Sequence, residues 1–262
     1  MLKNKKILIT GIANKYSIAL GIAQAMVREG AEIAIAYQNE RLLKNIEPIA
    51  QELGTDVLIE CDVSSDDSIN ASRDLIIEKW GTFDGFVHSI GFAPSDQLVG
   101  NFVDVTTREG FQIAHDVSSY SFTALSKAYK DILNENSALL TLTYLGSIQT
   151  MPNYNVMGLA KASLEANTRF LAASLGKDKI RVNAILPGLV AGDRQNNVLR
   201  NKAQRLGKSF SEVEEEAFSF TSIKEYVDAQ DIANQVMYLA SDAGMHVSGQ
   251  AIAIDCDTKM LL

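Results

Sequence analysis

Two side chains of complementary chemistry stand seven positions apart, at Tyr154 and Lys161. A phenolic hydroxyl donates a hydrogen bond and an ammonium supplies positive charge, so together they can stabilise negative charge that develops on an oxygen atom. On a helix of 3.6 residues per turn both would lie on one face, about 10.5 Å apart along the axis. The alternative interpretation is a surface tyrosine and lysine on an amphipathic helix.

The turn after residues 6–10, the first apolar run, is a candidate phosphate site. Gly11 permits a tight turn, and Gly21 permits close packing of the following helix against a sheet. The free amides and the dipole of a helix N-terminus suit a pyrophosphate. However, the strict glycine fingerprint of dinucleotide sites is absent, because Ala13 replaces one glycine and the spacing is longer. An ordinary strand-to-helix turn is therefore the alternative.

Two later features of the chain bear on a dinucleotide site. Gln38 follows the second apolar run with no adjacent arginine poised for a 2′-phosphate, which favours NADH over NADPH. Asp62 and Val63 follow the third run, where an acid and an apolar side chain would flank an adenine. The alternative for Asp62 is a helix cap ahead of Ser65.

An alternation of short apolar runs and helical stretches must position these groups. Strands are predicted at residues 6–10, 32–37, 56–60, 83–88, 138–144, 180–186 and 251–254, and helices at 17–28, 40–53, 65–79, 110–133 and 154–175. Continuous apolar strands indicate burial on both faces, and strand–helix alternation implies right-handed crossovers between parallel strands. The pattern predicts an α/β fold, a single Rossmann-like doubly wound parallel sheet with helices on both faces, over residues 1–262. Ligands bind such sheets at the carboxyl ends of the strands.

Residues 192–227 interrupt this rhythm. The segment is polar, charged and helical in composition, and we expect it to project above the carboxyl edge as a substrate lid. It carries basic residues that would steer an acidic partner toward the substrate, namely Arg194, Arg200, Lys202, Arg205 and Lys208. The alternative is a solvated helix face balanced by the acids Glu212, Glu214, Glu215 and Glu216.

The chain as a whole has 262 residues and a formal net charge of −8, which disfavours a general nucleic-acid binder. Cys61 and Cys256 are far apart and lack metal-like spacing, which indicates a reduced, cytoplasmic protein. No signal peptide or membrane span is predicted. The scattered histidines, His88, His115 and His246, are interpreted as structural, with no metal site.

These motifs, in this order, resemble those of the bacterial enoyl-acyl-carrier-protein reductases that use NADH, within the short-chain dehydrogenase superfamily. The resemblance covers most of residues 1–185 and is carried by residues 10–23, 62–63, 88–94, 107–111 and 154–167. It implies that Tyr154 stabilises the substrate carbonyl, that Lys161 holds the nicotinamide ribose hydroxyls, and that Tyr144 lines the substrate entrance. It also implies an enoyl substrate linked to acyl carrier protein, a role in fatty acid synthesis, and a homotetramer.

The predicted cofactor site for NADH/NAD combines the turn residues with positions that the resemblance implies. It comprises Gly11, Ser17, Ile18, Gln38, Asp62, Val63, Ser89, Ile90, Gly91, Lys161 and Val190. Ketone-reducing relatives place the tyrosine four residues before the lysine, where this chain has Met157, which cannot donate a proton. Reduction of an enoyl thioester instead delivers hydride to the β-carbon, and charge develops on an oxygen two bonds further away. The longer spacing therefore favours reduction of the α,β double bond.

The resemblance is expected to stop after Ile185. Residues 183–188, 228–242 and 247–250 look more like alcohol- or ketone-directed short-chain dehydrogenases, and Gly192 stands where the reductases place a threonine for the pyrophosphate. Two alternatives follow from this departure. One is a short-chain dehydrogenase acting on another carbonyl or enone substrate, and the other is a non-catalytic NAD-binding protein.

Overall fold

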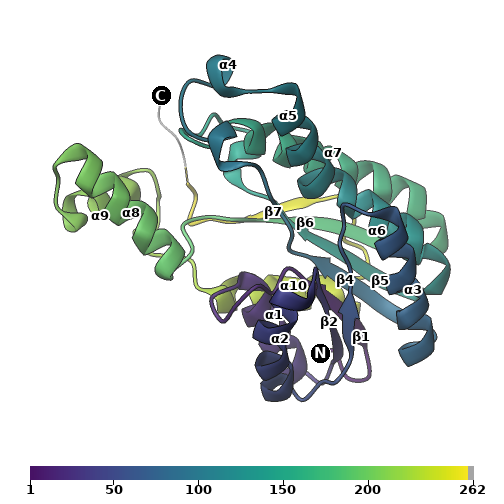
Figure 1. The fold of residues 1–262 in the computed structure, drawn as a ribbon. Helices are drawn as coiled ribbons and strands as arrows, with labels where there is room; N and C mark the ends of the chain where they lie inside the picture. The colour runs from purple at the N-terminus through teal and green to yellow at the C-terminus, as the bar shows by residue number, and fades with distance from the viewer. Residues whose placement is uncertain (259–262) are drawn as a thin grey trace.

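A parallel sheet of seven strands, in the order β3-β2-β1-β4-β5-β6-β7, forms the centre of the molecule (Figure 1). The structure is a computed structural model that describes residues 1–258. The strands are β1 (Lys6–Thr10), β2 (Glu32–Tyr37), β3 (Leu58–Glu60), β4 (Phe83–His88), β5 (Leu133–Leu142), β6 (Arg181–Pro187) and β7 (Ala251–Ile254). Every residue of β6 and nearly every residue of β1 is buried, as continuous apolar runs in a two-sided parallel sheet require.

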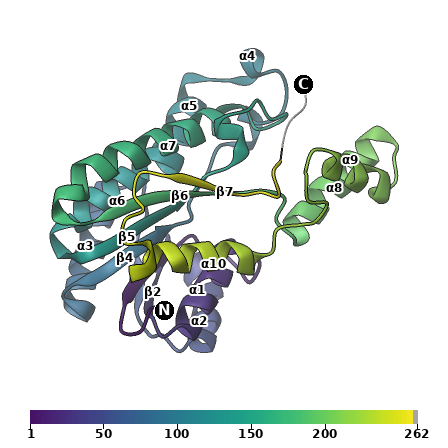
Figure 2. The same cartoon turned by 180° about the vertical axis from the view of Figure 1, so that it is seen from behind.

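Helices cover both faces of this sheet (Figures 1 and 2). One layer holds α1 (Ile18–Arg28), α2 (Glu40–Leu53) and α10 (Ala229–Ala240), and the other holds α3 (Asp66–Trp80), α5 (Arg108–His115), α6 (Ser121–Tyr129) and α7 (Asn155–Leu175). Each layer has its own buried apolar cluster against the sheet, with Met26 and Val236 in the first and Ile76 and Leu164 in the second. The predicted α/β fold with a doubly wound parallel sheet is confirmed.

The predicted single helix over residues 110–133 is wrong in two respects. A π-turn at Asp116–Tyr120 separates α5 from α6, and the helical stretch ends before β5 begins at Leu133. The π-turn adds a residue to one helical turn and so rotates its side chains, which leaves Ser118 and Ser119 buried. The early part of β5 is polar in sequence, and its pairing with β4 is irregular, with a register shift between Phe83 and Gly85. Because β5 begins with polar residues, the apolar pattern did not show where the helical stretch ends and the strand begins.

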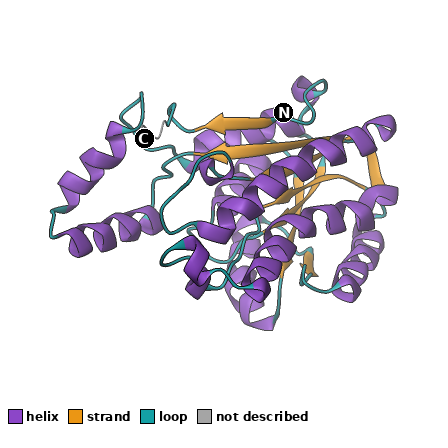
Figure 3. Ribbon diagram, turned by 90° about the horizontal axis from the view of Figure 1, so that it is seen from above, coloured by secondary structure: helices purple, strands orange, loops and turns teal. Residues whose placement is uncertain are grey.

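The predicted lid segment forms a helical hairpin of α8 (Asp193–Leu206) and α9 (Phe210–Ser219). Gly207 turns the chain in a left-handed conformation, with φ 64°, and Ser209 and Glu212 cap α9 reciprocally. The hairpin has a small apolar cluster of its own, built on Leu199, Ala203 and Val213. It extends away from the sheet and its two helical layers (Figures 2 and 3).

Among the helices formed by residues 1–258, none has both the length and the apolar character that crossing a membrane requires.

Candidate active site

The strand order reverses between β1 and β4, which makes this crevice the expected ligand site of a doubly wound sheet. The two strand ends approach closely there. A Cβ atom on Gly11 would lie 2.0 Å from the carbonyl oxygen of Ser89, and Gly11 has a φ of +85°. The hydroxyl of Thr10 accepts from the amide of Ser89 at 3.3 Å. Only glycine fits at position 11, so the backbone itself forms the floor of the crevice.

The turn from β1 into α1 is shaped by its own hydrogen bonds. Ser17 is the N-cap residue of α1, and its hydroxyl accepts from the amides of Ala13 and Asn14 at 3.0 and 3.2 Å. Ile18 begins α1 and packs partly buried against the core. The N-terminus of α1 therefore meets the crevice with an ordered turn, which fits a diphosphate group.

The ends of β2 and β3 are joined by side chains at the expected adenine end. Gln38 donates from Nε2 to a carboxylate oxygen of Asp62 at 3.2 Å. Partial burial opposes ionisation of Asp62, but hydrogen bonds from Ser64 and Gln38 outweigh it and lower its pKa below the ordinary value. Val63 is buried beside it. A carboxylate that stays ionised here would repel a 2′-phosphate, in agreement with the preference predicted from Gln38.

Lys161 lies beneath the loop that follows β4. Its side chain is only 7% exposed, and its Nζ donates to the carbonyl oxygen of Leu142 at 2.8 Å. A Cβ atom on Gly91 would lie 3.4 Å from Nζ, so the loop of Ser89, Ile90 and Gly91 passes directly by the ammonium. The structure thus brings Lys161 together with the cofactor positions predicted at the end of β4.

The sequence pattern predicted Tyr154 as the first residue of the helix, but it occupies the N-cap position just before α7. Its neighbours Asn153 and Asn155 both adopt positive φ, 59° and 35°, which asparagine tolerates better than most residues. A Cβ atom on Gly146 would lie 2.4 Å from the ring of Tyr154, so glycine leaves room for it. The ring centroid of Tyr144 is 5.1 Å away at an interplanar angle of 64°. The two tyrosines therefore form one aromatic pair at the carboxyl edge.

Val190 lies beyond the end of β6, where it forms a parallel bridge with Val227. The amide of Ala191 donates to the carbonyl oxygen of Val227 at 2.9 Å, and that of Val227 donates to the carbonyl oxygen of Leu189 at 2.8 Å. These bonds fix the chain that leads into α8. Gly192, at its start, has a φ of +138°.

The chain was compared with protein-family models and with known proteins. A family model described as enoyl-(acyl carrier protein) reductase matches residues 11–256. The chain belongs to this family. It is 49% identical to the NADH enoyl-[acyl-carrier-protein] reductase FabI of Escherichia coli (strain K12), covering 97% of this chain and 94% of the relative. It is 42% identical to the corresponding protein of Enterococcus faecalis, covering 97% of each.

Solved structures of the enoyl reductase family share the fold over the same extent. The enoyl-[acyl-carrier-protein] reductase (NADH) of Aquifex aeolicus VF5 has a TM-score of 0.88 and 35% identity, covering 98% of this chain and 96% of that one. The enoyl reductase of Anaplasma phagocytophilum in complex with NAD has a TM-score of 0.86 and 34% identity, covering 98% and 92%. Since these matches run through the C-terminal third, the expectation that the resemblance stops after Ile185 is wrong.

Residues that the sequence analysis did not assign to the site hold its loops in place. Ser118, in the π-turn, accepts from the amide of Phe92 and donates to its carbonyl oxygen, both at 2.9 Å. The side-chain amide of Asn155 donates to the carbonyl oxygens of Gln97 and Leu98 at 3.2 and 3.3 Å. In the sequence, the serine-rich run at 118–121 and the asparagines on either side of Tyr154 were the signals that could have indicated these supporting residues.

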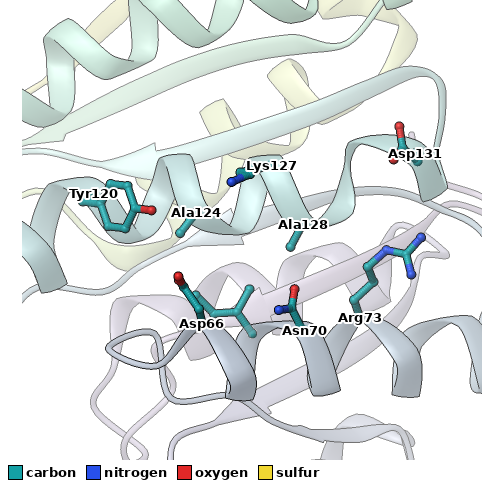
Figure 4. Close-up of a pocket in the computed structure, with 9 residues that line it drawn as sticks. Asp66, Asn70, Arg73, Tyr120, Ala124, Lys127, Ala128 and Asp131 are labelled. Carbon is teal, nitrogen blue, oxygen red and sulfur yellow. The ribbon is translucent and has the colours of Figure 1, made fainter.

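Two cavities lie away from this edge. One, of about 360 Å³, lies between α3 and α6 and is lined by charged side chains, among them Arg73, Lys127 and Asp131 (Figure 4). The other, of about 730 Å³, is an open hollow over α5, α6 and α7. Neither includes Tyr154 or Lys161. The described residues also bring no three His, Cys, Asp or Glu side chains together in a group that could hold a metal ion.

His88, at the end of β4, is fully buried and holds three elements together. Its Nδ1 contacts the hydroxyl of Thr141 in β5 at 2.8 Å, and its Nε2 contacts the hydroxyl of Ser121 in α6 at 2.8 Å. Burial and, second, the charge of Lys161 lower the pKa of His88 from 6.5 to about 3. The imidazole is therefore neutral in the folded protein, which agrees with its interpretation as structural.

The buried His88 predicts a specific loss of stability in acid. The unfolded chain takes up a proton near pH 6.5 and the folded chain near pH 3, so this contribution to stability is complete above pH 6.5 and is lost as the pH falls between these values. Relative to His88→Asn, the unfolding free energy of the wild type should fall by about 1.4 kcal/mol more per pH unit between about pH 6 and pH 4. Denaturant unfolding at several pH values measures this. Parallel slopes for both proteins would contradict a neutral buried imidazole.

Proposed function

We propose that this chain reduces the α,β double bond of an enoyl thioester bound to acyl carrier protein, with NADH as the reductant, in fatty acid synthesis. The placement of Lys161 beneath Gly91, with Tyr154 beside Tyr144 at the same edge of the sheet, carries the proposal. Membership of the enoyl reductase family supports the reaction and the substrate class.

The residues at the carboxyl edge fit a nicotinamide dinucleotide. The bare backbone at Gly11 and the ordered turn capped by Ser17 would hold the diphosphate, and Lys161 would bind the nicotinamide ribose beside the Ser89–Gly91 loop. Gln38, Asp62 and Val63 would enclose the adenine end, Ile18 would contact the diphosphate, and Val190 would meet the nicotinamide amide. When bound, NADH supplies the hydride.

Tyr154 and Lys161 would act on the substrate oxygen. Addition of hydride at the β-carbon moves negative charge onto the thioester oxygen, and the hydroxyl of Tyr154 donates a hydrogen bond to it, as an oxyanion donor does. The ammonium of Lys161 stabilises the same charge through its field. Protonation at the α-carbon completes the reduction. Tyr144 would line the entrance and hold the ring of Tyr154 edge-on.

The α8–α9 hairpin would close over the acyl chain as a lid, over about residues 192–227. Its glycine at position 192 and its independent apolar cluster suit movement as a unit. Of its basic side chains, Lys202 and Lys208 pair with Glu216 at 3.0 and 3.2 Å, which favours the balanced helix face over a free basic patch. The side chain of Arg194 lies outside the described residues.

We also propose a homotetramer in the cytoplasm. The outer face of α5, the π-turn, α6 and α7 carries exposed apolar side chains, among them Phe111 and Tyr120 at the larger hollow and Phe170 on α7. Phe170 is 76% exposed, so most of its apolar surface is available to a partner. A second copy of the chain would cover this face symmetrically.

The deciding experiment follows NADH oxidation by the wild type with a crotonyl thioester beside a panel of ketones. We expect turnover of the enoyl thioester, at least tenfold faster with NADH than with NADPH, and little ketone reduction. Ketone turnover with weak enoyl activity would identify a short-chain dehydrogenase for another carbonyl substrate. Tight NADH binding without turnover of any substrate would identify a non-catalytic NAD-binding protein.

A further inference from the structure

Glu165 is the only acidic side chain that is buried in the described part of the chain, with 9% of its surface exposed. A buried carboxylate is costly unless hydrogen bonds or a cation compensate for lost hydration. One oxygen of Glu165 accepts from the hydroxyl of Thr143 at 2.7 Å. This hydrogen bond compensates for part of that cost.

Glu165 lies one helical turn after Lys161, on the same face of α7. The two side chains reach consecutive residues at the end of β5. Lys161 donates to the carbonyl oxygen of Leu142 at 2.8 Å, and Glu165 accepts from Thr143 at 2.7 Å. Thr143 is itself tied to β6, because its amide donates to the carbonyl oxygen of Ile185 at 2.8 Å. Two adjacent bonds therefore dock α7 onto β5 at the place where the chain continues into Tyr144.

The carboxylate of Glu165 also lies close enough to Lys161 for its charge to affect the ammonium. Side chains four positions apart on a helix have Cβ atoms about 5–6 Å apart, close enough for their charges to interact. Screening by solvent is weak here, because both side chains are buried. His88 also feels the charge of Lys161, but its imidazole is neutral and cannot balance an ammonium. Glu165 is therefore a buried acid one helical turn from Lys161, where a negative charge can act on the ammonium.

We infer that Glu165 is a positioning residue for Lys161: its carboxylate, anchored by Thr143, docks α7 against the end of β5 and balances the ammonium charge so that Nζ stays at the cofactor loop. The inference rests on the proposed function, since it assigns Lys161 to the cofactor. Glu165 itself would touch neither cofactor nor substrate. Its effect on NADH would therefore depend on the presence of Lys161.

A double-mutant cycle on NADH affinity tests this dependence, with fluorescence of bound NADH as the readout. Glu165→Gln, which keeps the shape and loses the charge, should raise the Kd for NADH about tenfold in the wild-type background, within the range of coupling between neighbouring residues. In the Lys161→Ala background the same change should alter Kd less than twofold. Glu135→Gln removes an equal charge from an exposed position of β5 and serves as the matched control.

Changes at Thr143 keep the test independent of how well Glu165→Gln folds. Thr143→Val removes the hydroxyl and should raise Kd in the same direction, whereas Thr143→Ser retains it and should restore the wild-type value. An equal loss of affinity from Glu165→Gln with and without Lys161, or no loss in a folded variant, overturns the inference. A wild type that neither binds NADH nor reduces a crotonyl thioester would instead overturn the proposed function, and the inference with it.

Discussion

Tyr154→Phe is expected to lower kcat for an enoyl thioester by about a hundredfold to a thousandfold, the range found when one oxyanion donor is removed. The variant loses only the hydroxyl, and the ring still fills the space that Gly146 leaves and still packs edge-on against Tyr144. The hydroxyl is needed when charge develops on the substrate oxygen, so the loss should fall on kcat rather than on the Kd for NADH. Stopped-flow single-turnover rates with saturating NADH measure the effect.

Tyr238→Phe is the matched control, because Tyr238 is a partly exposed tyrosine on α10 that takes no part in the proposed site. It should retain the wild-type kcat within about twofold, as surface substitutions usually do. A Tyr154→Phe variant that turns over as fast as this control would show that another group stabilises the charge. The site would then need a different donor at the same edge.

The α/β fold was predictable because its signal is repeated along the chain. Each buried strand is a continuous apolar run, as in Arg181–Pro187, and each crossover helix supplies one apolar face, so a local error does not change the topology. The failures came where tertiary packing decides the local structure. The π-turn at Asp116–Tyr120 and the polar start of β5 at Leu133 have no periodicity of their own, and the sheet register determines where β5 begins.

The candidate site was predictable to the extent that it rests on backbone turns and motif spacing. Gly11 and Lys161 lie where the sequence placed them because a strand end and a helix face fix them. The supporting bonds were not predictable. Thr143 and Glu165 are 22 residues apart in sequence, and only the packing of α7 on β5 brings them within 2.7 Å. The same is true of Ser118, which holds Phe92 from a turn that sequence pattern predicted as plain helix.

Gly11→Ala is expected to lower the free energy of unfolding by about 3 kcal/mol, the sum of a left-handed alanine and an overpacked contact. The new methyl group would start 2.0 Å from the carbonyl oxygen of Ser89, whereas ordinary contacts begin near 3.4 Å, so β1 and β4 must separate by more than an ångström. That separation opens the crevice where the cofactor would lie. A shift of about 1 Å at a positioned reactant costs roughly a hundredfold in rate, and kcat/KM for NADH should fall by about that factor.

Gly54→Ala separates the two causes of this effect. Gly54 ends α2 with a φ of +71°, close to the +85° of Gly11, but a Cβ atom there would meet nothing within 4 Å. It should lose only about 1 kcal/mol of stability, from the left-handed conformation alone, and should leave kcat/KM unchanged. Thermal unfolding and NADH kinetics on both variants make the comparison. Equal losses of stability would show that backbone strain alone limits position 11, and unchanged kinetics in Gly11→Ala would mean that the dinucleotide does not lie between β1 and β4.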